Sequence, residues 1–479
     1  MKKFDLNIEK VLEHWTVPHA LREIIANALD EASLTGNEEP VIFKNKDGNW
    51  HIKDQGRGLR YEHLTQNENV EKVKNPNKVI GKFGVGLKDA MATFDRRKIG
   101  VLIQSKFSDI TIEKAPKGDF DDVVTLHAIV NSPTYPDMIG TEFIFTGLLD
   151  EEIEKAKDFF IVYSGERTIE STKYGSLIEN KKNRSRIYVN GLCVAEEENL
   201  LFSYNITSTT KKLLQSLNRE RTNVGRTAYT DRVKSILMDC SSPEFARKLV
   251  NDLEKIQTGN AHDELDWIDV QLHACRILSS QEQVIFVRAV DLMDGGKFLS
   301  YAKNDGEKII TVPDLLASKL ESNHDLKGNN FRNLNTYAEE WNEKFEFEFI
   351  DVKNLTKKER AVFDTKDIIM NWFPKKSRII KSIKVSEKMR PDDHTGGDAL
   401  GLWEPSNQRI IIKRSQLKDL QSFSGTFLHE LVHAFTGTDD NTLEFEHALT
   451  EMLGELAETS LNSSSSTKGK LGLRWLLKV

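Results

Sequence analysis

Three short stretches near the start of the chain decide the fold: REIIANALDEA at residues 22–32, DQGRGL at residues 54–59 and GKFGVGLKDAM at residues 81–91. The first lies in a helix predicted over residues 8–34, because its apolar residues recur three and four positions apart. The third carries glycines ahead of another helical pattern. Glycines cluster in many turns, so one such stretch is a weak signal, whereas the three in this order are specific.

Runs of strand-forming residues surround these stretches. Strands are predicted at residues 41–44, 50–53, 101–104, 110–113, 123–129 and 142–145. Further along, a strand at residues 186–189 turns at Asn190-Gly191, helical patterns fill residues 228–253, and another strand is predicted at residues 284–289. The sequence therefore predicts a mixed α/β (α+β) protein of several domains.

The predicted domains are residues 1–158, 159–285, 286–365 and 366–479. The first two are α/β domains and the third is a middle or linker domain with charged helices. The fourth carries a metal motif and ends in a Ser-rich linker and a short tail. A chain of 479 residues exceeds what one hydrophobic core normally organises, which agrees with this division.

Composition restricts the partners and the compartment. The net charge of −7 would repel phosphate backbones and anionic membranes, so nucleic acid is disfavoured as a partner and a membrane is excluded. The three cysteines form neither a disulfide framework nor a CxxC site. The sequence has no apolar run typical of a signal peptide or membrane span, so a cytoplasmic location is predicted.

The three opening stretches resemble the first, second and third boxes of the GHKL, or Bergerat-fold, ATPases. This is the family of gyrase, MutL, histidine kinases, microrchidia proteins and heat-shock chaperone ATPases. IGTEFIF at residues 139–145 is similar to the family's fourth box. The resemblance covers roughly the first 150 residues. It implies a GHKL α/β sandwich for residues 1–158, a transducer-like domain for residues 159–285, and ATP with Mg²⁺ as cofactors.

The spacing of the first box puts Glu23 and Asn27 one helical turn apart on the same face. The resemblance implies that Glu23 is the general base that activates the attacking water, and that Asn27 offers its side-chain oxygen to magnesium. It also implies that Asp54 accepts a hydrogen bond from the adenine amino group. Gly58 would permit the close approach of the base, and Thr141 would support it from beneath.

The third box is expected to surround the phosphates. The resemblance implies that Gly81, Gly84, Val85 and Gly86 wrap the triphosphate with backbone N–H groups ahead of a helix N-terminus. Lys88 would add a direct positive charge. The polar residues 60–80 suit the mobile lid of this family.

A second motif, FLHELVHAF, occupies residues 427–435. His429 and His433 are four positions apart, so on a helix both imidazoles can bind one Zn²⁺, with Glu430 beside them as general base. Gly437 is expected to end the helix. The region resembles the zincin metallopeptidases, in the branch whose third ligand is a glutamate on a second helix. The strand predicted at residues 409–413 takes the position of the zincin edge strand that aligns substrate.

Periodicity indicates which glutamate is the third ligand. A helix from residue 443 to about residue 460 is predicted, capped within residues 440–442. Its apolar stripe consists of Phe445, Leu449, Met452, Leu453 and Leu456. Glu446 falls about 70° from the centre of this stripe, closer than the other acidic residues, and is the predicted third ligand. Asp439 and Asp440 are reserve candidates, because loop or capping roles explain them adequately.

The two motifs together predict an ATP-regulated zinc endopeptidase acting on a protein or peptide substrate. Nucleotide binding is expected to close the lid and to form a homodimer, and the expected setting is a triggered stress or phage-defence response. One alternative is a MutL-like or microrchidia-like nucleic-acid-handling ATPase with structural zinc, which the acidic charge disfavours. Another is a chaperone-like ATPase that binds peptides without cutting them, which would not need Glu430 beside the metal.

Overall fold

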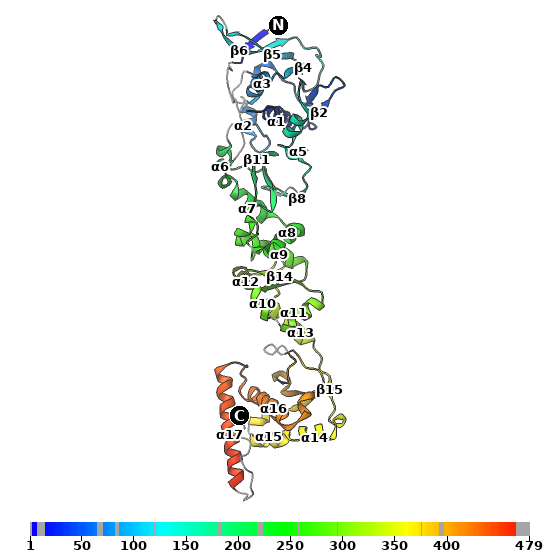
Figure 1. Ribbon diagram of the computed structural model, residues 1–479, viewed down its shortest axis with the longest axis vertical. Helices are drawn as coiled ribbons and strands as arrows, with labels where there is room; N and C mark the ends of the chain where they lie inside the picture. The colour runs from blue at the N-terminus through cyan, green and yellow to red at the C-terminus, as the bar shows by residue number, and fades with distance from the viewer. Residues whose placement is uncertain are drawn as a thin grey trace. The chain divides into compact units, whose positions relative to one another are not determined.

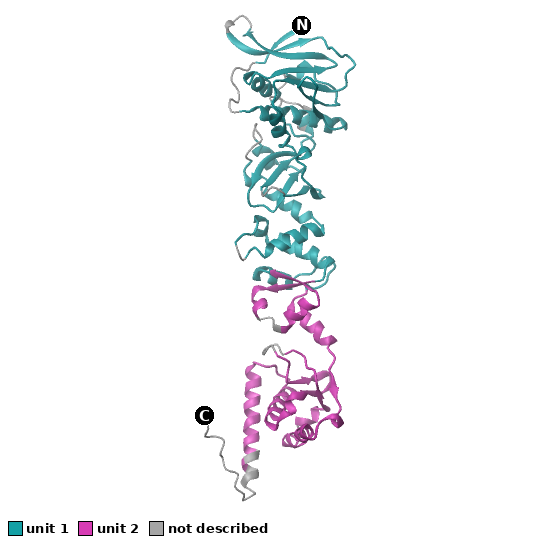
Figure 2. Cartoon of the chain, turned by 45° about the vertical axis from the view of Figure 1, so that its right-hand side comes forward, with its two compact units in different colours: residues 1–283, 312–331 teal, residues 284–311, 332–479 magenta. Residues whose placement is uncertain are grey.

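The computed structural model describes residues 2–6, 15–64, 70–81, 86–117, 120–180, 184–217, 224–256, 259–294, 296–374, 376–391 and 397–465. The chain divides into two compact units, one of residues 1–283 with 312–331 and one of residues 284–311 with 332–479 (Figure 2). Helices and strands occur in both units, so the predicted mixed α/β class is confirmed. Within the described ranges, no helix is both long enough and apolar enough to span a bilayer.

The first unit begins with a seven-stranded antiparallel sheet in the order β1-β6-β5-β4-β7-β3-β2 (Figure 1). Its strands are β1 (Lys2–Asp5), β2 (Val41–Lys44), β3 (Trp50–Lys53), β4 (Gly100–Ser105), β5 (Ser108–Lys117), β6 (Phe120–Asn131) and β7 (Thr141–Thr146). The predicted hairpin is confirmed, because β2 and β3 pair with Ile42 opposite Ile52. The other four strands predicted in this region lie within β4 to β7.

Two helices form the core with this sheet, α1 (Val17–Thr35) and α3 (Gly86–Arg96). Ile24 and Ile25 of α1 and Phe94 of α3 are fully buried in it. The first helix was predicted over residues 8–34; residues 15 and 16 are not helical, and residues 8–14 lie outside the described residues. Thr16 has extended backbone and caps the helix, so α1 begins at Val17. Two shorter helices are α2 (Val70–Lys74), which follows the stretch at residues 54–59, and α4 (Asp150–Lys157), which follows the stretch at residues 139–145.

A five-stranded sheet in the order β11-β10-β12-β9-β8 follows in the same unit. Its strands are β8 (Thr168–Thr172), β9 (Gly175–Glu179), β10 (Ser185–Val189), β11 (Leu192–Glu197) and β12 (Phe202–Ile206). Helices α5 (Ile161–Ser164), α6 (Lys211–Ser216), α7 (Thr230–Asp239), α8 (Pro243–Leu253), α9 (Ile268–Gln281) and α12 (Asp314–Glu321) complete the unit. The helical pattern predicted over residues 228–253 is two helices, since Ser242 caps α8 and Pro243 starts it.

The second unit opens with a small two-stranded sheet of β13 (Val284–Arg288) and β14 (Lys308–Val312). Helices α10 (Ala289–Asp294), α11 (Gly296–Asn304) and α13 (Leu334–Lys344) belong with it. Its core includes Ile285, Phe298 and Tyr337.

The rest of the second unit is a four-stranded sheet in the order β15-β16-β18-β17 with helices around it. The elements are β15 (Phe349–Ile350), β16 (Ser382–Ser386), β17 (Gly401–Glu404), β18 (Arg409–Lys413), α14 (Lys357–Phe363), α15 (Lys366–Trp372), α16 (Leu420–Thr436) and α17 (Leu443–Ser465). Its core takes in Leu355 and Phe363, which precede residue 366, where the sequence predicts the last domain to start. The Ser-rich linker runs past the described residues and the tail lies outside them.

The edge of this sheet differs from the prediction. The strand at residues 409–413, expected at the edge, is β18, which lies between β16 and β17. Its three isoleucines, Ile410, Ile411 and Ile412, are fully buried, as in a strand covered on both faces. The edge strand next to it is β17, whose shorter and more polar sequence gave no strand signal.

Candidate functional site

Helix α1 carries Glu23 into the interior of the first unit. The side chain is buried, and Arg22 Nη2 lies 3.0 Å from Glu23 Oε1. A Cβ atom added to Gly86 would lie 2.3 Å from Glu23 Oε2, so a larger residue there would displace the Glu23 carboxylate. The first and third stretches of the sequence therefore meet directly.

One turn further along α1, Asn27 and Asp30 share a cation from the protein itself. Lys72 Nζ of α2 lies 2.9 Å from Asn27 Oδ1 and 2.7 Å from Asp30 Oδ2. The buried Asp30 also accepts hydrogen bonds from the backbone N–H groups of Ile80 and Gly81. Sequence reasoning missed Asp30 and Lys72 as site residues. Asp30 lies within the first box and could have been found there, whereas Lys72 gave no signal.

The second and fourth boxes also meet. Asp54 is buried, and its Oδ1 accepts hydrogen bonds from Gly56 N at 2.8 Å and Thr141 N at 3.2 Å. Burial raises the pKa of the Asp54 carboxyl, and these backbone N–H groups act against the shift. Gly58 and Gly140 both have positive φ, and a Cβ on Gly140 would lie 1.9 Å from the Asp54 carbonyl oxygen. Asp54, Gly58 and Thr141 are thus brought together, as expected for one recognition site.

An ion-pair cluster joins three segments at the rim of this region. Arg57 pairs with Glu31 of α1 at 2.8 Å and with Glu71 of α2 at 3.0 Å. The hydrogen bonds from Arg57 lower the pKa of Glu31. These pairs are partly exposed, so their main effect is to position α2 near α1.

The predicted phosphate loop is only partly described. Gly81 is buried and Gly86 begins α3, while Lys88 is half-buried on α3. Gly84 and Val85 lie outside the described residues. Their predicted contacts with phosphate therefore stay predictions.

In the second unit, α16 brings His429 and His433 together. Their Nε2 atoms lie 3.1 Å apart. Asp440 Oδ1 lies 3.1 Å from His429 Nε2 and 3.4 Å from His433 Nε2. These three side chains form a cluster able to hold a metal ion. The sequence placed Asp440 only in reserve, and the structure brings it to the histidines.

The surroundings of the cluster orient its ligands. His433 Nδ1 lies 2.7 Å from the Thr438 carbonyl oxygen, so Nδ1 carries the proton and Nε2 is left to bind a metal. Phe445 of α17 packs against both imidazoles, with ring centroids 4.9 Å from His429 and 4.5 Å from His433. Gly437 ends α16 in the left-handed conformation, as predicted, and turns the chain toward Asp440.

Glu430 lies between α16 and the edge strand. It is 6% exposed, and burial raises its pKa to about 8, while the backbone N–H of Trp403 donates to it and lowers the pKa. A cation held by the cluster would lower the pKa further. A Cβ on Gly401 would lie 2.6 Å from Glu430 Cγ, so β17 passes directly over the carboxylate. The catalytic glutamate predicted by sequence thus lies against a sheet edge.

The predicted third ligand, Glu446, lies elsewhere. It is exposed on α17 and is not a member of the cluster. The predicted apolar stripe is correct for Phe445 and Met452, which are buried, but Leu453 is 58% exposed. The helix starts at Leu443 with Thr442 as its cap. Asp440, which contacts the histidines, therefore lies in the turn before the helix.

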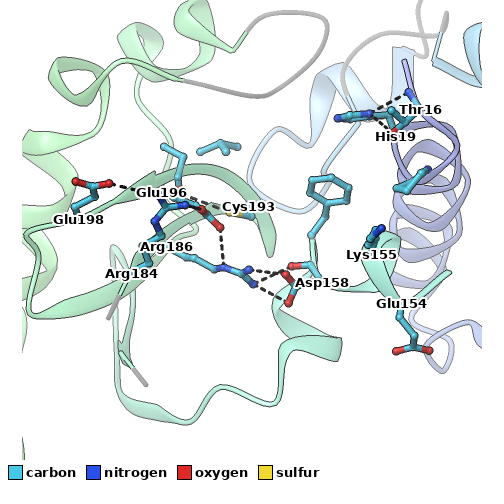
Figure 3. Close-up of a pocket in the computed structure, with 14 residues that line it drawn as sticks. Thr16, His19, Glu154, Lys155, Asp158, Arg184, Arg186, Cys193, Glu196 and Glu198 are labelled. Carbon is cyan, nitrogen blue, oxygen red and sulfur yellow. Dashed lines mark hydrogen bonds and ion pairs between the residues drawn. The ribbon is translucent and has the colours of Figure 1, made fainter. Parts of the chain in front are cut away.

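A pocket of about 930 Å³ lies in the first unit between α1, α4 and the β10–β11 hairpin. Figure 3 shows Arg186 of β10 extending to Asp158, which follows α4, with Glu196 on its other side. None of the predicted nucleotide-binding residues lines this pocket. The pocket lies where α1 and α4 meet the β10–β11 hairpin, and its lining includes neither Glu23 nor Asp54.

Comparison with known proteins gives three matches. Residues 151–243 match the family described as the Mycoplasma pneumoniae MPN635 N-terminal domain. An uncharacterised protein of Mycoplasma pneumoniae is 38% identical over 242 residues, covering 50% of this chain and 97% of the relative. A second uncharacterised protein of that organism is 25% identical over 333 residues, covering 65% of this chain and 93% of the relative.

Proposed function

The chain belongs to the same family as the first of these Mycoplasma pneumoniae proteins, and we propose that it is an ATP-regulated zinc endopeptidase. The observation that carries the proposal is the convergence of His429, His433 and Asp440 beside a buried glutamate at a sheet edge. The proposed regulation by ATP rests on the first unit, where the four stretches that resemble the GHKL boxes lie together.

The three ligand atoms fit zinc. Two imidazole nitrogens on a tetrahedral ion at the usual bond length are about 3.3 Å apart. The His429 and His433 Nε2 atoms are 3.1 Å apart, and Asp440 Oδ1 is 3.1 and 3.4 Å from them. Two imidazoles and one carboxylate leave a fourth position open, which is typical of catalytic rather than structural zinc. The zinc would lower the pKa of a water and polarise the scissile carbonyl.

Glu430 and β17 would carry out the rest of the chemistry. Glu430 accepts the proton of the attacking water and later donates it to the leaving amine. A peptide substrate pairs with the free edge of β17, which holds its scissile bond over Glu430. The contact between Gly401 and Glu430 supports this register, because no side chain separates the edge strand from the carboxylate.

For the first unit we propose ATP and Mg²⁺ as ligands, with Glu23 as general base and Asn27 as magnesium ligand. Asn27 and Asp30 already hold the ammonium group of Lys72, so this pair suits a cation. Asp54 suits an adenine amino group, since it is buried and fixed by two backbone amides. ATP binding would exchange Lys72 for magnesium, close the lid and form a homodimer. We place the protein in the cytoplasm, where its three cysteines, all described and free, stay reduced.

One experiment tests both halves. An unstructured protein is incubated with the zinc-loaded chain, with and without ATP and magnesium, beside the variants Glu23→Ala and Glu430→Ala. Cleavage that needs ATP and both glutamates supports the proposal. Cleavage lost only in Glu430→Ala would separate the ATPase from the protease. ATP hydrolysis without any cleavage, together with salt-sensitive DNA binding, would favour a nucleic-acid-handling ATPase instead.

A further inference from the structure

The turn of the β10–β11 hairpin contacts the segment that leads into the nucleotide region. Asn190 Nδ2 donates hydrogen bonds to the Pro76 carbonyl at 2.9 Å and to the Val79 carbonyl at 2.8 Å. Thr209, which follows β12, donates from its backbone N–H and its hydroxyl to Asn77 Oδ1, at 3.2 and 2.7 Å. Asn190 and Thr209 thus together bind the segment at residues 76–79.

This segment connects the side chains and amides of the proposed nucleotide site. Lys72, which contacts Asn27 and Asp30, precedes it by one helical turn. Ile80 and Gly81, whose amides bind Asp30, follow it directly. A shift of residues 76–79 would therefore alter both the hydrogen bonds of Asp30 and the position of Gly81, where the predicted phosphate loop starts.

The hairpin is fixed at its other contacts. Arg186 of β10 binds the Asp158 carboxylate with Nη1 at 3.0 Å and the Asp158 carbonyl at 3.1 Å (Figure 3). Ile161 N donates to the Gly191 carbonyl at 2.9 Å, and Cys193 N donates to the Phe159 carbonyl at 2.8 Å. These bonds hold the hairpin to the end of α4, so Asn190 is presented on a rigid support.

The residue type at the turn is restricted by its conformation. Asn190 has φ +48, in the left-handed region that asparagine and glycine tolerate best. A turn of this kind accepts several residues, including aspartate and glycine, but only asparagine among them donates two side-chain hydrogen bonds. The two carbonyl contacts therefore depend on the asparagine amide and not on the turn itself.

We propose that Asn190 is a positioning residue of the nucleotide site, through which the domain at residues 151–243 sets the lid segment and senses nucleotide. The inference rests on the proposed ATP binding. With Asn190 in place, residues 76–79 hold Ile80 and Gly81 against Asp30. Because the hairpin is held to the end of α4, a movement of the segment on nucleotide binding would change the Asn190 contacts rather than the hairpin.

Two substitutions of different kind test this role. Asn190→Gly keeps the left-handed turn and removes the amide, and it also removes Oδ1, which is buried without a partner among the described residues. Asn190→Asp keeps the size and the turn but places a carboxylate against two carbonyl oxygens. We expect ATP affinity to fall about tenfold in Asn190→Gly and further in Asn190→Asp, as two hydrogen bonds are lost. The midpoint of thermal unfolding should shift by no more than about 4 °C in Asn190→Gly.

The measurements are ATP binding by calorimetry, ATP hydrolysis, and the zinc content of the chain by mass spectrometry. The full chain is used. Thr209→Val removes the hydroxyl contact to Asn77, and we expect it to lower ATP affinity about threefold. Zinc content should not change, since Asn190 lies in the other unit. Unchanged ATP affinity in both Asn190 variants, with a parent chain that binds ATP, would overturn this inference alone. A parent chain that binds no ATP would overturn the proposed function and this inference together.

Discussion

The two candidate sites are built in opposite ways. The candidate metal cluster comes from residues 429–440, with β17 supplying the edge beside it. The candidate nucleotide site combines α1, the loop after β3, α2, the start of α3 and the start of β7. In the first, the side chains converge on a position where an ion fits. In the second, Asn27 and Glu23 already contact Lys72 and Arg22. A compact motif can be ready for its ligand, whereas a composite site must exchange protein partners for it.

The largest effect should come from the metal site. Glu430→Gln should lower peptide cleavage by about 1,000-fold, because the amide cannot accept the proton of the attacking water. Zinc binding should remain, since the three ligand side chains are untouched. Cleavage of a fluorescent peptide and metal content by mass spectrometry provide the readouts, with Glu446→Gln as the exposed control. Full activity in Glu430→Gln would remove the reason to call this site catalytic.

The corresponding change in the composite site is Glu23→Gln, for which we expect ATP hydrolysis to fall about 100-fold. This change also removes the carboxylate charge that lies 3.0 Å from the buried Arg22, so the variant should lose stability as well. Hydrolysis is therefore measured beside urea unfolding and ATP binding, with the exposed Glu38→Gln as control. Retained hydrolysis in a folded, ATP-binding variant would show that another group is the base.

The identity of the third ligand sharpens the comparison. Asp440→Ala should weaken zinc binding by more than about 100-fold, beyond the usual cost of losing an outer partner. Glu446→Ala should bind zinc as the parent does, because Glu446 is exposed and outside the cluster. Competition with a chelating dye measures both affinities. The reverse result would restore the glutamate that the helical periodicity indicates.

This reversal shows how far the sequence could lead. Spacing of four on a helix is a local property, so His429, His433 and Glu430 could be predicted, as could the end of α16 at Gly437. The position of Asp440 depends on the left-handed turn after α16, which periodicity does not describe. Lys72 was missed for a similar reason, since its contact with Asn27 joins residues 45 positions apart. The edge strand was misplaced because β18 has the stronger strand sequence, as central strands do.

A smaller effect is expected at the edge strand. Gly401→Ala would place a methyl group 2.6 Å from Glu430 Cγ, so β17 or the carboxylate must shift. We expect peptide cleavage to fall about tenfold, since misplacement on this scale impairs alignment, while zinc affinity stays unchanged. Kinetics with a peptide series separates kcat from KM. Gly425→Ala on α16 is the matched control, because an added Cβ there meets no atom within 4 Å beyond its chain neighbours and the backbone of its own helix. Equal losses in both variants would mean that β17 does not align the substrate.

The smallest effect should come from the lysine that holds the composite site. Lys72→Ala removes the ammonium group from Asn27 and Asp30, which lie 2.9 and 2.7 Å from it. Magnesium and ATP would then no longer compete with an internal cation, so we expect ATP affinity in the presence of magnesium to rise about threefold. Lys74→Ala, an exposed neighbour on α2, should leave it unchanged. A fall in affinity would mean that Lys72 turns to the phosphates when ATP binds. In that case Lys72 would be a ligand of the phosphates. The composite site would then differ from the metal cluster in the residues that bind the ligand, and not in having to exchange a protein partner for it.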